Sequence, residues 1–299
     1  MSSPGAPPAS FSPTSAPISL SFPSPHIALI TLNNPTKLNS LKSSDVAHLV
    51  DALEWVASQP DEAIPICVLT GKGRFFSAGA DVHDPSRQPP PEAANNPRIL
   101  KDFYTQRLAL SNARLARVLS TFPKVLVGAM NGPAVGISAA VLGHCDLLYT
   151  LQDFWLQVPF TQLGLVCEGL TSTTFIQRMG HGRGVECLLE GGRVPAAELE
   201  RSGFITRILA PPPTASNGQD GTPPILNAVL ERLEQRLSPP SIDPFALAYS
   251  KRLIQKATYE SLGSEEANQA ELRGAEIVFT SGKPAERFAA IAGGKRHKL

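Results

Sequence analysis

The chain has 299 residues, of which 42% are hydrophobic, and 27 Lys and Arg balance 26 Asp and Glu to give a formal net charge of +1. This near-neutral balance excludes a polyanion-binding surface, so nucleic acid is not an expected partner, and no apolar stretch approaches the length of a membrane span. The length is enough to bury a substantial core, and we expect one main α/β domain with a terminal extension.

The N-terminal part of the chain predicts a tail followed by a strand pair and a helix. Residues 1–15 are rich in Ser, Pro and Ala and predict a disordered tail, after which residues 16–240 form the core domain. Alternating apolar residues over 18–22 and again over 26–32 predict two paired strands. Residues 45–57 place their apolar side chains on one helical face.

Two glycine-centred turns each follow an apolar strand. The strand at 66–69 leads into the turn at 74–81, whose small residues let a ligand approach the main chain, so the amide of Ala80 is a natural donor. The second turn, at 131–140, follows a strand at 124–130 and opens a helix of small residues. Unpaired amides at a helix start suit developing negative charge, although each turn alone also fits a tight strand-to-helix link.

The rest of the chain continues the alternation of strands and helices. Residues 83–98, with several prolines, predict a mobile loop before a long helix over 99–119. A strand and three helices are then predicted at 147–151, 170–178, 183–189 and 196–203. A polar, proline-rich surface insertion occupies 211–224, and residues 241–299 form a helical C-terminal region. This order of elements is typical of a layered α/β fold.

Glu168 is the most informative acidic residue. The apolar run at 163–167 leads directly into it, and a carboxylate held against an apolar wall has a raised pKa suited to moving a proton. Position alone favours a second interpretation, because a glutamate at a helix start often only interacts favourably with the helix dipole. The histidines are dispersed and the four cysteines lack paired spacing, so no metal site or disulfide framework is expected.

Several motifs together resemble the crotonase superfamily of enoyl-CoA hydratases and isomerases, and most closely its fungal peroxisomal Δ3,Δ2-enoyl-CoA isomerases. The resemblance runs from about residue 18 to the C-terminus and rests on residues 34–41, 76–81, 131–134, 145–146 and 159–165. It implies a ClpP/crotonase-like fold of repeated ββα units. It also implies that the C-terminal helical region covers the active site and assembles the chain into a homotrimer or hexamer.

The same resemblance implies a role for each site residue. The amides of Ala80 and Ile137 form an oxyanion hole for the thioester oxygen of an acyl-CoA, and Glu168 is the acid/base. The implied substrate-binding residues are Lys37, Leu38, Ala78, Gly79, Asp81, Val82 and Gly136. Lys37 and Leu38 either contact the CoA moiety or simply end a strand, and Asp81 is expected to cap the next turn. No cofactor is expected, since CoA is part of the substrate.

Two acidic residues that this chain lacks distinguish the activities within the family. Family hydratases place a water with two glutamates, and dienoyl-CoA isomerases carry acidic residues at the same two positions; this chain has Ala140 and Phe160 there. The single Glu168 therefore indicates a shift of 3-enoyl-CoA to 2-trans-enoyl-CoA through a dienolate, in β-oxidation of unsaturated fatty acids. The alternatives are a dienoyl-CoA isomerase, another acyl-CoA enzyme of the superfamily, or a noncatalytic acyl-CoA-binding or assembly subunit.

The last three residues, His297-Lys298-Leu299, resemble the C-terminal peroxisomal address Ser-Lys-Leu. His in the first position departs from the commonest form. The resemblance predicts a peroxisomal location, with the peroxisomal import receptor as a partner.

Overall fold

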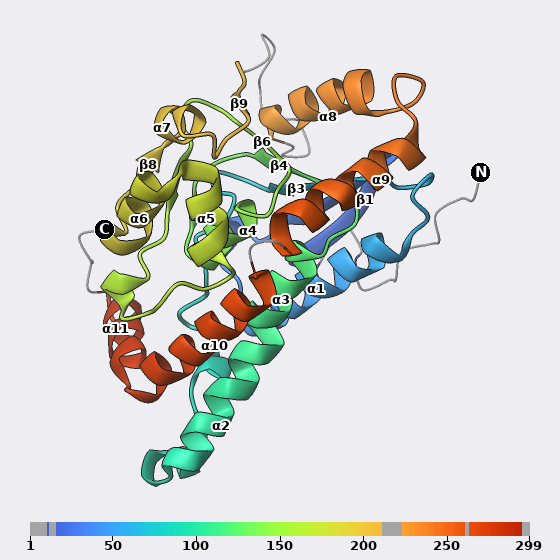
Figure 1. Cartoon of the computed structure of the whole chain (residues 1–299). Coiled ribbons are helices and arrows are strands. Elements are labelled where there is room, and N and C mark those ends of the chain that lie inside the picture. The colour runs from blue at the N-terminus through green and yellow to red at the C-terminus, as the bar shows by residue number, and fades with distance from the viewer. Residues whose placement is uncertain (1–10, 12–15, 211–222, 261–262, 295–299) are drawn as a thin grey trace.

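A computed structural model describes residues 11, 16–210, 223–260 and 263–294 (Figure 1). The strands are β1 (Ile18–Ser24), β2 (Ile27–Leu32), β3 (Ile66–Gly71), β4 (Val125–Met130), β5 (Ala134–Val135), β6 (Leu147–Thr150), β7 (Trp155–Gln157), β8 (Val194–Pro195) and β9 (Arg207–Ile208). The α-helices are α1 (Ser43–Ser58), α2 (Pro97–Leu108), α3 (Arg114–Ser120), α4 (Ile137–Leu142), α5 (Thr171–Met179), α6 (His181–Glu190), α7 (Ala196–Arg201), α8 (Pro224–Leu237), α9 (Pro244–Gln255), α10 (Ser264–Thr280) and α11 (Lys283–Ala292).

The main sheet has the strand order β1-β2-β3-β4-β6-β9. β1 and β2 pair antiparallel, as a hairpin, and each of the other neighbours pairs parallel. Every residue of β3 and β4 is buried, which is the pattern of parallel strands covered on both faces. A second, smaller sheet consists of three strands in the order β5-β7-β8. The predicted α/β class and the predicted strands are confirmed.

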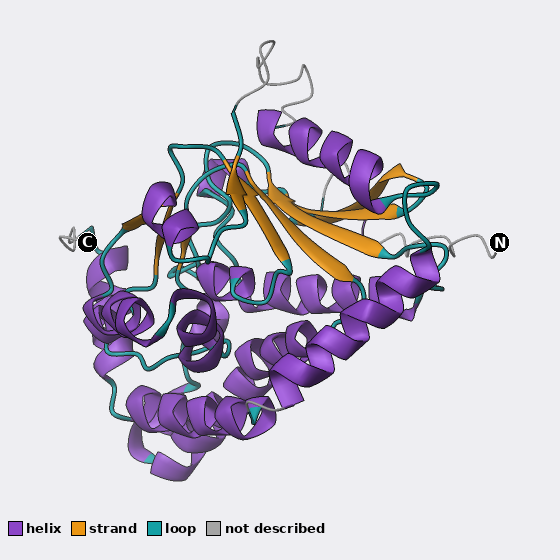
Figure 2. Cartoon of the chain, turned by 45° about the horizontal axis from the view of Figure 1, so that its top comes forward, coloured by secondary structure: helices purple, strands orange, loops and turns teal. Residues whose placement is uncertain are grey.

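Helices cover the two faces of the main sheet unequally (Figure 2). Successive side chains of a strand point to opposite faces, so Val68 packs with Val229 and Leu233 of α8, whereas Cys67 and Leu69 join the larger core. That larger core includes side chains of α1 and α4 and holds the site described below. α8 lies in a stretch for which the sequence predicts no element.

Several predicted boundaries change in the structure. The helix expected over 99–119 is α2, a five-residue π-helix η5 (Ala109–Ala113) and α3 in succession. The expected loop at 83–98 contains the short 3-10 helices η3 (Pro85–Arg87) and η4 (Pro91–Asn95), and α2 begins at Pro97. The expected insertion is shorter at its end, because Pro224 is already the first residue of α8.

The predicted tail and insertion fall mostly outside the described residues. Residues 211–222 are outside them, and of the segment 1–15 only Phe11 is described, 5% exposed and packed in the larger core. The address at 297–299 also lies outside them.

The C-terminal helices lie against the middle of the chain. α10 contacts α2, α3, η5 and α5, and α11 contacts the short 3-10 helix η6 (Thr161–Leu163). Helices from the middle and from the C-terminal part of the sequence therefore lie together on one side of the sheet (Figure 1). Within the described part of the chain, no helix combines the length and apolar character that crossing a membrane requires.

Candidate active site

The two predicted turns lie side by side. Ser77 and Ala134 form a parallel bridge, and the N–H of Val135 donates to the carbonyl of Ser77 at 3.0 Å. Gly79 has φ +87°, and a Cβ there would meet the carbonyl oxygen of Val135 at 2.6 Å. Only glycine allows both this left-handed conformation and this close approach, so the turns can meet only if position 79 has no side chain.

Two amide side chains, those of Asn131 and the buried Asn39, hold the first turn in place. Nδ2 of Asn131 donates to the carbonyls of Gly73 and Phe75, and its Oδ1 accepts from the N–H of Gly71 at 2.9 Å. Nδ2 of Asn39 also donates to the carbonyl of Phe75, at 2.8 Å. These contacts fix main-chain groups that no regular strand or helix pairs, as buried polar groups require.

The main-chain amides of Ala80 and Ile137 are available as donors. Among the described residues, neither N–H donates a hydrogen bond to another protein group. Gly136, with φ +61°, turns the chain into α4, and Ile137 is the first residue of that helix, where amides have no partner within the helix. Ala80 and Ile137 line the same cavity as Glu168.

The segment that carries Glu168 is held by contacts from distant elements. Glu271 of α10 accepts hydrogen bonds from the N–H groups of Leu170 at 2.7 Å and Ser172 at 3.0 Å. Nε2 of His144 donates to the carbonyl of Gly169 at 2.8 Å. The backbone immediately after Glu168 is therefore fixed from both sides before α5 begins.

The carboxylate of Glu168 is 8% exposed and accepts a hydrogen bond from Nδ2 of Asn112. Burial raises the pKa of Glu168 above its ordinary value of 4.5, while the Asn112 hydrogen bond and the charges of Arg87 and Arg107 act in the opposite direction. A buried carboxyl group with a raised pKa is suited to accept and return a proton near neutral pH.

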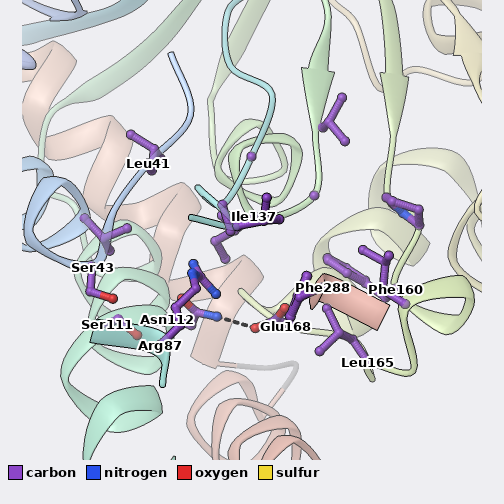
Figure 3. A pocket seen from close by; sticks show the side chains of 18 of the residues that line it. Leu41, Ser43, Arg87, Ser111, Asn112, Ile137, Phe160, Leu165, Glu168 and Phe288 are labelled. Atoms are coloured by element: carbon purple, nitrogen blue, oxygen red, sulfur yellow. Dashed lines mark hydrogen bonds between the residues drawn. The ribbon is translucent and has the colours of Figure 1, made fainter. Parts of the chain in front are cut away.

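The cavity around Glu168 has a volume of about 180 Å³ and opens to solvent. Figure 3 shows side chains that line it around the Asn112–Glu168 hydrogen bond. Its apolar lining includes Phe160, Leu165, Phe279 of α10 and Phe288 of α11. Of the described residues that line it, Glu168 alone carries a carboxyl group.

The structure brings together most of the predicted site residues. The predicted residues that line this cavity are Ala78, Gly79, Ala80, Val82, Gly136, Ile137 and Glu168. Ala140 and Phe160 are both buried, and Phe160 faces the cavity with no group that can exchange a proton.

Three predicted substrate-binding residues do not line the cavity. Nζ of Lys37 lies 3.5 Å from a carboxylate oxygen of Asp81, and the carbonyl of Leu38 accepts from the N–H of Ala78 at 2.9 Å. Asp81 accepts from the N–H of His83 at 2.9 Å, so the predicted capping role of Asp81 is confirmed. Contact of Lys37 and Leu38 with the CoA moiety stays a prediction.

Five polar residues that line the cavity are absent from the predicted site: Ser43, Arg87, Arg107, Ser111 and Asn112. Asn112 lies in the π-helix η5, Arg107 in α2 and Arg87 at the end of η3. A π-helical turn inside a longer helix often marks a functional site, but its widened hydrogen-bond pattern leaves no signal in residue spacing. The described residues contain no group of three or more His, Cys, Asp or Glu side chains placed to hold a metal ion.

Comparison with known proteins identifies a matching family model and relatives that span most of the chain. The family model for enoyl-CoA hydratase/isomerase matches residues 24–215. A Delta(3,5)-Delta(2,4)-dienoyl-CoA isomerase of Pyricularia oryzae is 33% identical over 277 residues, covering 91% of this chain and 96% of that protein. A 3,2-trans-enoyl-CoA isomerase of Saccharomyces cerevisiae is 26% identical over 273 residues, covering 91% and 93%.

A solved structure extends the similarity to the whole fold. The crystal structure of an enoyl-CoA hydratase from Mycobacterium avium subsp. paratuberculosis superposes with a TM-score of 0.72 at 26% identity, covering 92% of this chain and 99% of that one. This confirms the crotonase fold predicted from the sequence. The chain belongs to the enoyl-CoA hydratase/isomerase family.

Proposed function

We propose that the protein is a Δ3,Δ2-enoyl-CoA isomerase. Glu168 removes a proton from C2 of a 3-enoyl-CoA, the resulting dienolate carries its charge on the thioester oxygen, and Glu168 returns the proton to C4. The double bond then lies between C2 and C3, and no proton is gained or lost overall. The N–H groups of Ala80 and Ile137 donate to the charged oxygen, and each such donor contributes about 3–4 kcal/mol in acyl-transfer enzymes.

The observation that carries this proposal is the single carboxyl group among the described residues that line the cavity. Glu168 is buried and its pKa is raised, while the positions of a second acid in the family hold Ala140 and Phe160. Water addition needs a second group to orient the water. One carboxylate beside two free main-chain donors suffices for a shift of the double bond by one position.

A dienoyl-CoA isomerase is the second candidate, and the similarity to the Pyricularia oryzae protein of that name supports it. Its reaction moves a proton over a longer conjugated system, and family members carry additional acidic residues for this purpose. The chemistry of the cavity lining therefore favours the first candidate over the second.

An assay of the purified protein with three thioesters separates the candidates. We expect turnover of 3-hexenoyl-CoA, and little turnover of 3,5-octadienoyl-CoA or hydration of 2-hexenoyl-CoA. Faster reaction of the dienoyl thioester would assign the second activity. Binding of all three without any reaction would identify a noncatalytic acyl-CoA-binding subunit.

We further propose that the protein acts in peroxisomes and as a homo-oligomer. The resemblance of His297-Lys298-Leu299 to a peroxisomal address supports the location, as does the similarity to a mouse protein named enoyl-CoA delta isomerase 3, peroxisomal, which is 29% identical over 185 residues. Four large apolar side chains of α9 are at least half exposed, which supports a subunit contact there: Phe245, Tyr249, Leu253 and Ile254. Sedimentation analysis measures the subunit number directly.

A further inference from the structure

Two arginines line the otherwise mostly apolar cavity. Arg107 comes from α2 and stacks its guanidinium over the ring of Phe279, 5.3 Å from the ring centre. Arg87 lies over the ring of Phe288 at 5.8 Å, and its Nε donates to the carbonyl of Asp81 at 3.0 Å. Both side chains are thus held at the cavity wall by packing and, for Arg87, by the oxyanion turn.

The guanidinium of Arg107 has unused donors. Its Nε and Nη1 atoms are shielded from solvent and have no hydrogen-bond partner among the described residues. An unsatisfied buried donor costs free energy, and more so when it is charged. Within the described part of the chain, neither arginine forms a salt bridge, and the Glu168 carboxylate is hydrogen-bonded to Asn112 instead.

The lining of the cavity holds more guanidinium than carboxyl groups. Burial, followed by the repulsion from Arg87, lowers the pKa of Arg107 to about 10, so both guanidinium groups are charged at neutral pH. The lining holds two guanidinium groups and one carboxyl group, that of Glu168, while the carboxylates of Asp84 and Asp81 outside the lining offset part of the positive charge. A fatty acyl chain, which is neutral and apolar, offers no acceptor to the unpaired donors of Arg107.

We propose that Arg107, with Arg87 nearby, binds a carboxylate carried by the acyl group, so that the substrates include CoA thioesters of dicarboxylic 3-enoic acids. This inference rests on the proposed isomerase function, because it names the acyl group that reaches Glu168. A carboxylate can accept charge-assisted hydrogen bonds from the unpaired donors of a guanidinium, and such bonds are strong when shielded from water.

The phosphates of CoA are the other source of negative charge. Arg107 packs on Phe279 with its Nε and Nη1 atoms shielded from solvent, and burying a multiply charged diphosphate there would cost much more than burying one carboxylate. The residues predicted to contact CoA, Lys37 and Leu38, lie outside this cavity. Both observations favour the acyl carboxylate.

Binding of saturated thioesters tests the proposal without any turnover. Calorimetry of the full-length protein would compare adipoyl-CoA with hexanoyl-CoA and suberoyl-CoA with octanoyl-CoA, since these ligands have no double bond to move. At one chain length at least, we expect the dicarboxylic thioester to bind roughly 10- to 100-fold more tightly than its monocarboxylic counterpart. Arg107→Met should abolish this preference.

Arg98→Met is the matched control, because Arg98 lies on the same helix with its side chain 90% exposed. It should leave the preference unchanged. The same measurements with pantetheine thioesters, which lack the nucleotide phosphates, distinguish binding of the acyl carboxylate from binding of the CoA phosphates. The proposal requires that the preference for the dicarboxylic ligand persist in the pantetheine thioesters.

Three results would overturn the proposal. The first is that no dicarboxylic thioester binds more tightly than its counterpart, a result that needs no variant. The second is a preference that survives in Arg107→Met. The third is that Arg107→Met binds the dicarboxylic and the monocarboxylic CoA thioesters with an equal loss of affinity, but binds the pantetheine thioesters as the parent does. This result would assign Arg107 to the CoA phosphates. Failure of the isomerase assay alone, with the binding preference present, would refute the proposed function and leave the carboxylate site standing.

Discussion

Glu168 combines a chemical function with a cost in stability. Its carboxyl group is buried, and burial raises its pKa, so the charged form is less stable in the folded protein than in the unfolded chain. Stability from this group is complete below its unfolded pKa and is lost as the pH rises through the folded value. Asn112 and two guanidinium groups offset part of this cost.

Replacement of Glu168 by Gln should therefore separate activity from stability. The amide keeps the shape and still accepts the Asn112 hydrogen bond, but it cannot take a proton, so we expect isomerase activity to fall by about 10² to 10⁴-fold. The melting temperature at pH 7 should equal or exceed that of the parent, and acyl-CoA affinity should change little. Glu265→Gln, at an exposed ion pair with Arg117, is the control. Activity within tenfold of the parent would remove Glu168 from its role.

Gly79 allows the two oxyanion turns to meet. In Gly79→Ala, the new Cβ would meet the Val135 carbonyl at 2.6 Å in a left-handed conformation, at a cost of about 1–3 kcal/mol. Because the shift displaces the Ala80 amide, kcat should fall by roughly 10²-fold. Gly182→Ala is the matched control, because a Cβ added at Gly182 would meet no neighbouring group within 4 Å. Thermal melts and kcat of both variants provide the measurement; equal kcat values would show that the turn tolerates the displacement.

At the scale of secondary structure, distant helices complete the site. The π-helix η5 between α2 and α3 supplies Asn112, and α10 supplies Glu271, whose carboxylate accepts from the amides that follow Glu168. Neither element belongs to the strand-turn-helix segments that carry Ala80 and Ile137. The oxyanion donors and the proton-transferring group are therefore positioned by different parts of the chain.

Asn112→Ala should change the pH profile in a defined direction. The Asn112 hydrogen bond stabilises the charged carboxylate and so opposes the effect of burial on the pKa of Glu168. Without it the pKa rises further, and the acid limb of kcat/KM moves to higher pH. Gln106→Ala, exposed on α2, should leave the limb in place. If the acid limb of kcat/KM in Asn112→Ala is unchanged or moves to lower pH, this account is contradicted.

Glu271→Ala should loosen the segment that carries Glu168. The variant leaves the N–H groups of Leu170 and Ser172 without their acceptor, and an unsatisfied buried group, as at Leu170, costs about 1–3 kcal/mol. We expect a lower melting temperature together with a lower kcat. Glu266→Ala, exposed on the same helix, should change neither. Full activity in Glu271→Ala would mean that the segment is held by its other contacts.

At the scale of the whole molecule, the C-terminal region has two separate roles. Its helices α10 and α11 contribute Phe279 and Phe288 to the cavity, so they are part of the site rather than an appendage. The residues after 294 lie outside the described structure, and their predicted role is an address. The two roles can be tested independently.

Deletion of His297 to Leu299 should leave activity in vitro unchanged and move the protein from peroxisomes to the cytosol. The address is read through the last residues and the free carboxylate, which the deletion removes. Fluorescent fusions at the N-terminus, with and without these residues, make the comparison. Identical diffuse staining of both would show that the tail is not a targeting signal.

Local features of this protein could be predicted from the order of its residues. Apolar patterns predicted β1, β2, β3, β4 and β6 of the main sheet but not the two-residue β9, and glycine and small residues marked both oxyanion turns, because these features depend on neighbours close in the chain. The predicted position of Glu168 at the end of an apolar run also agrees with its burial. The family motifs are local in the same sense.

Packing between distant elements determines which residues surround Glu168. Asn112 lies 56 positions before it and Glu271 lies 101 positions after Leu170, so no local spacing connects them. Arg107 belongs to a helix whose inward face is defined only once α10 packs against it. The turns were predictable because backbone sterics act within a few residues, whereas the charge and selectivity of the cavity depend on packing between elements far apart in the chain.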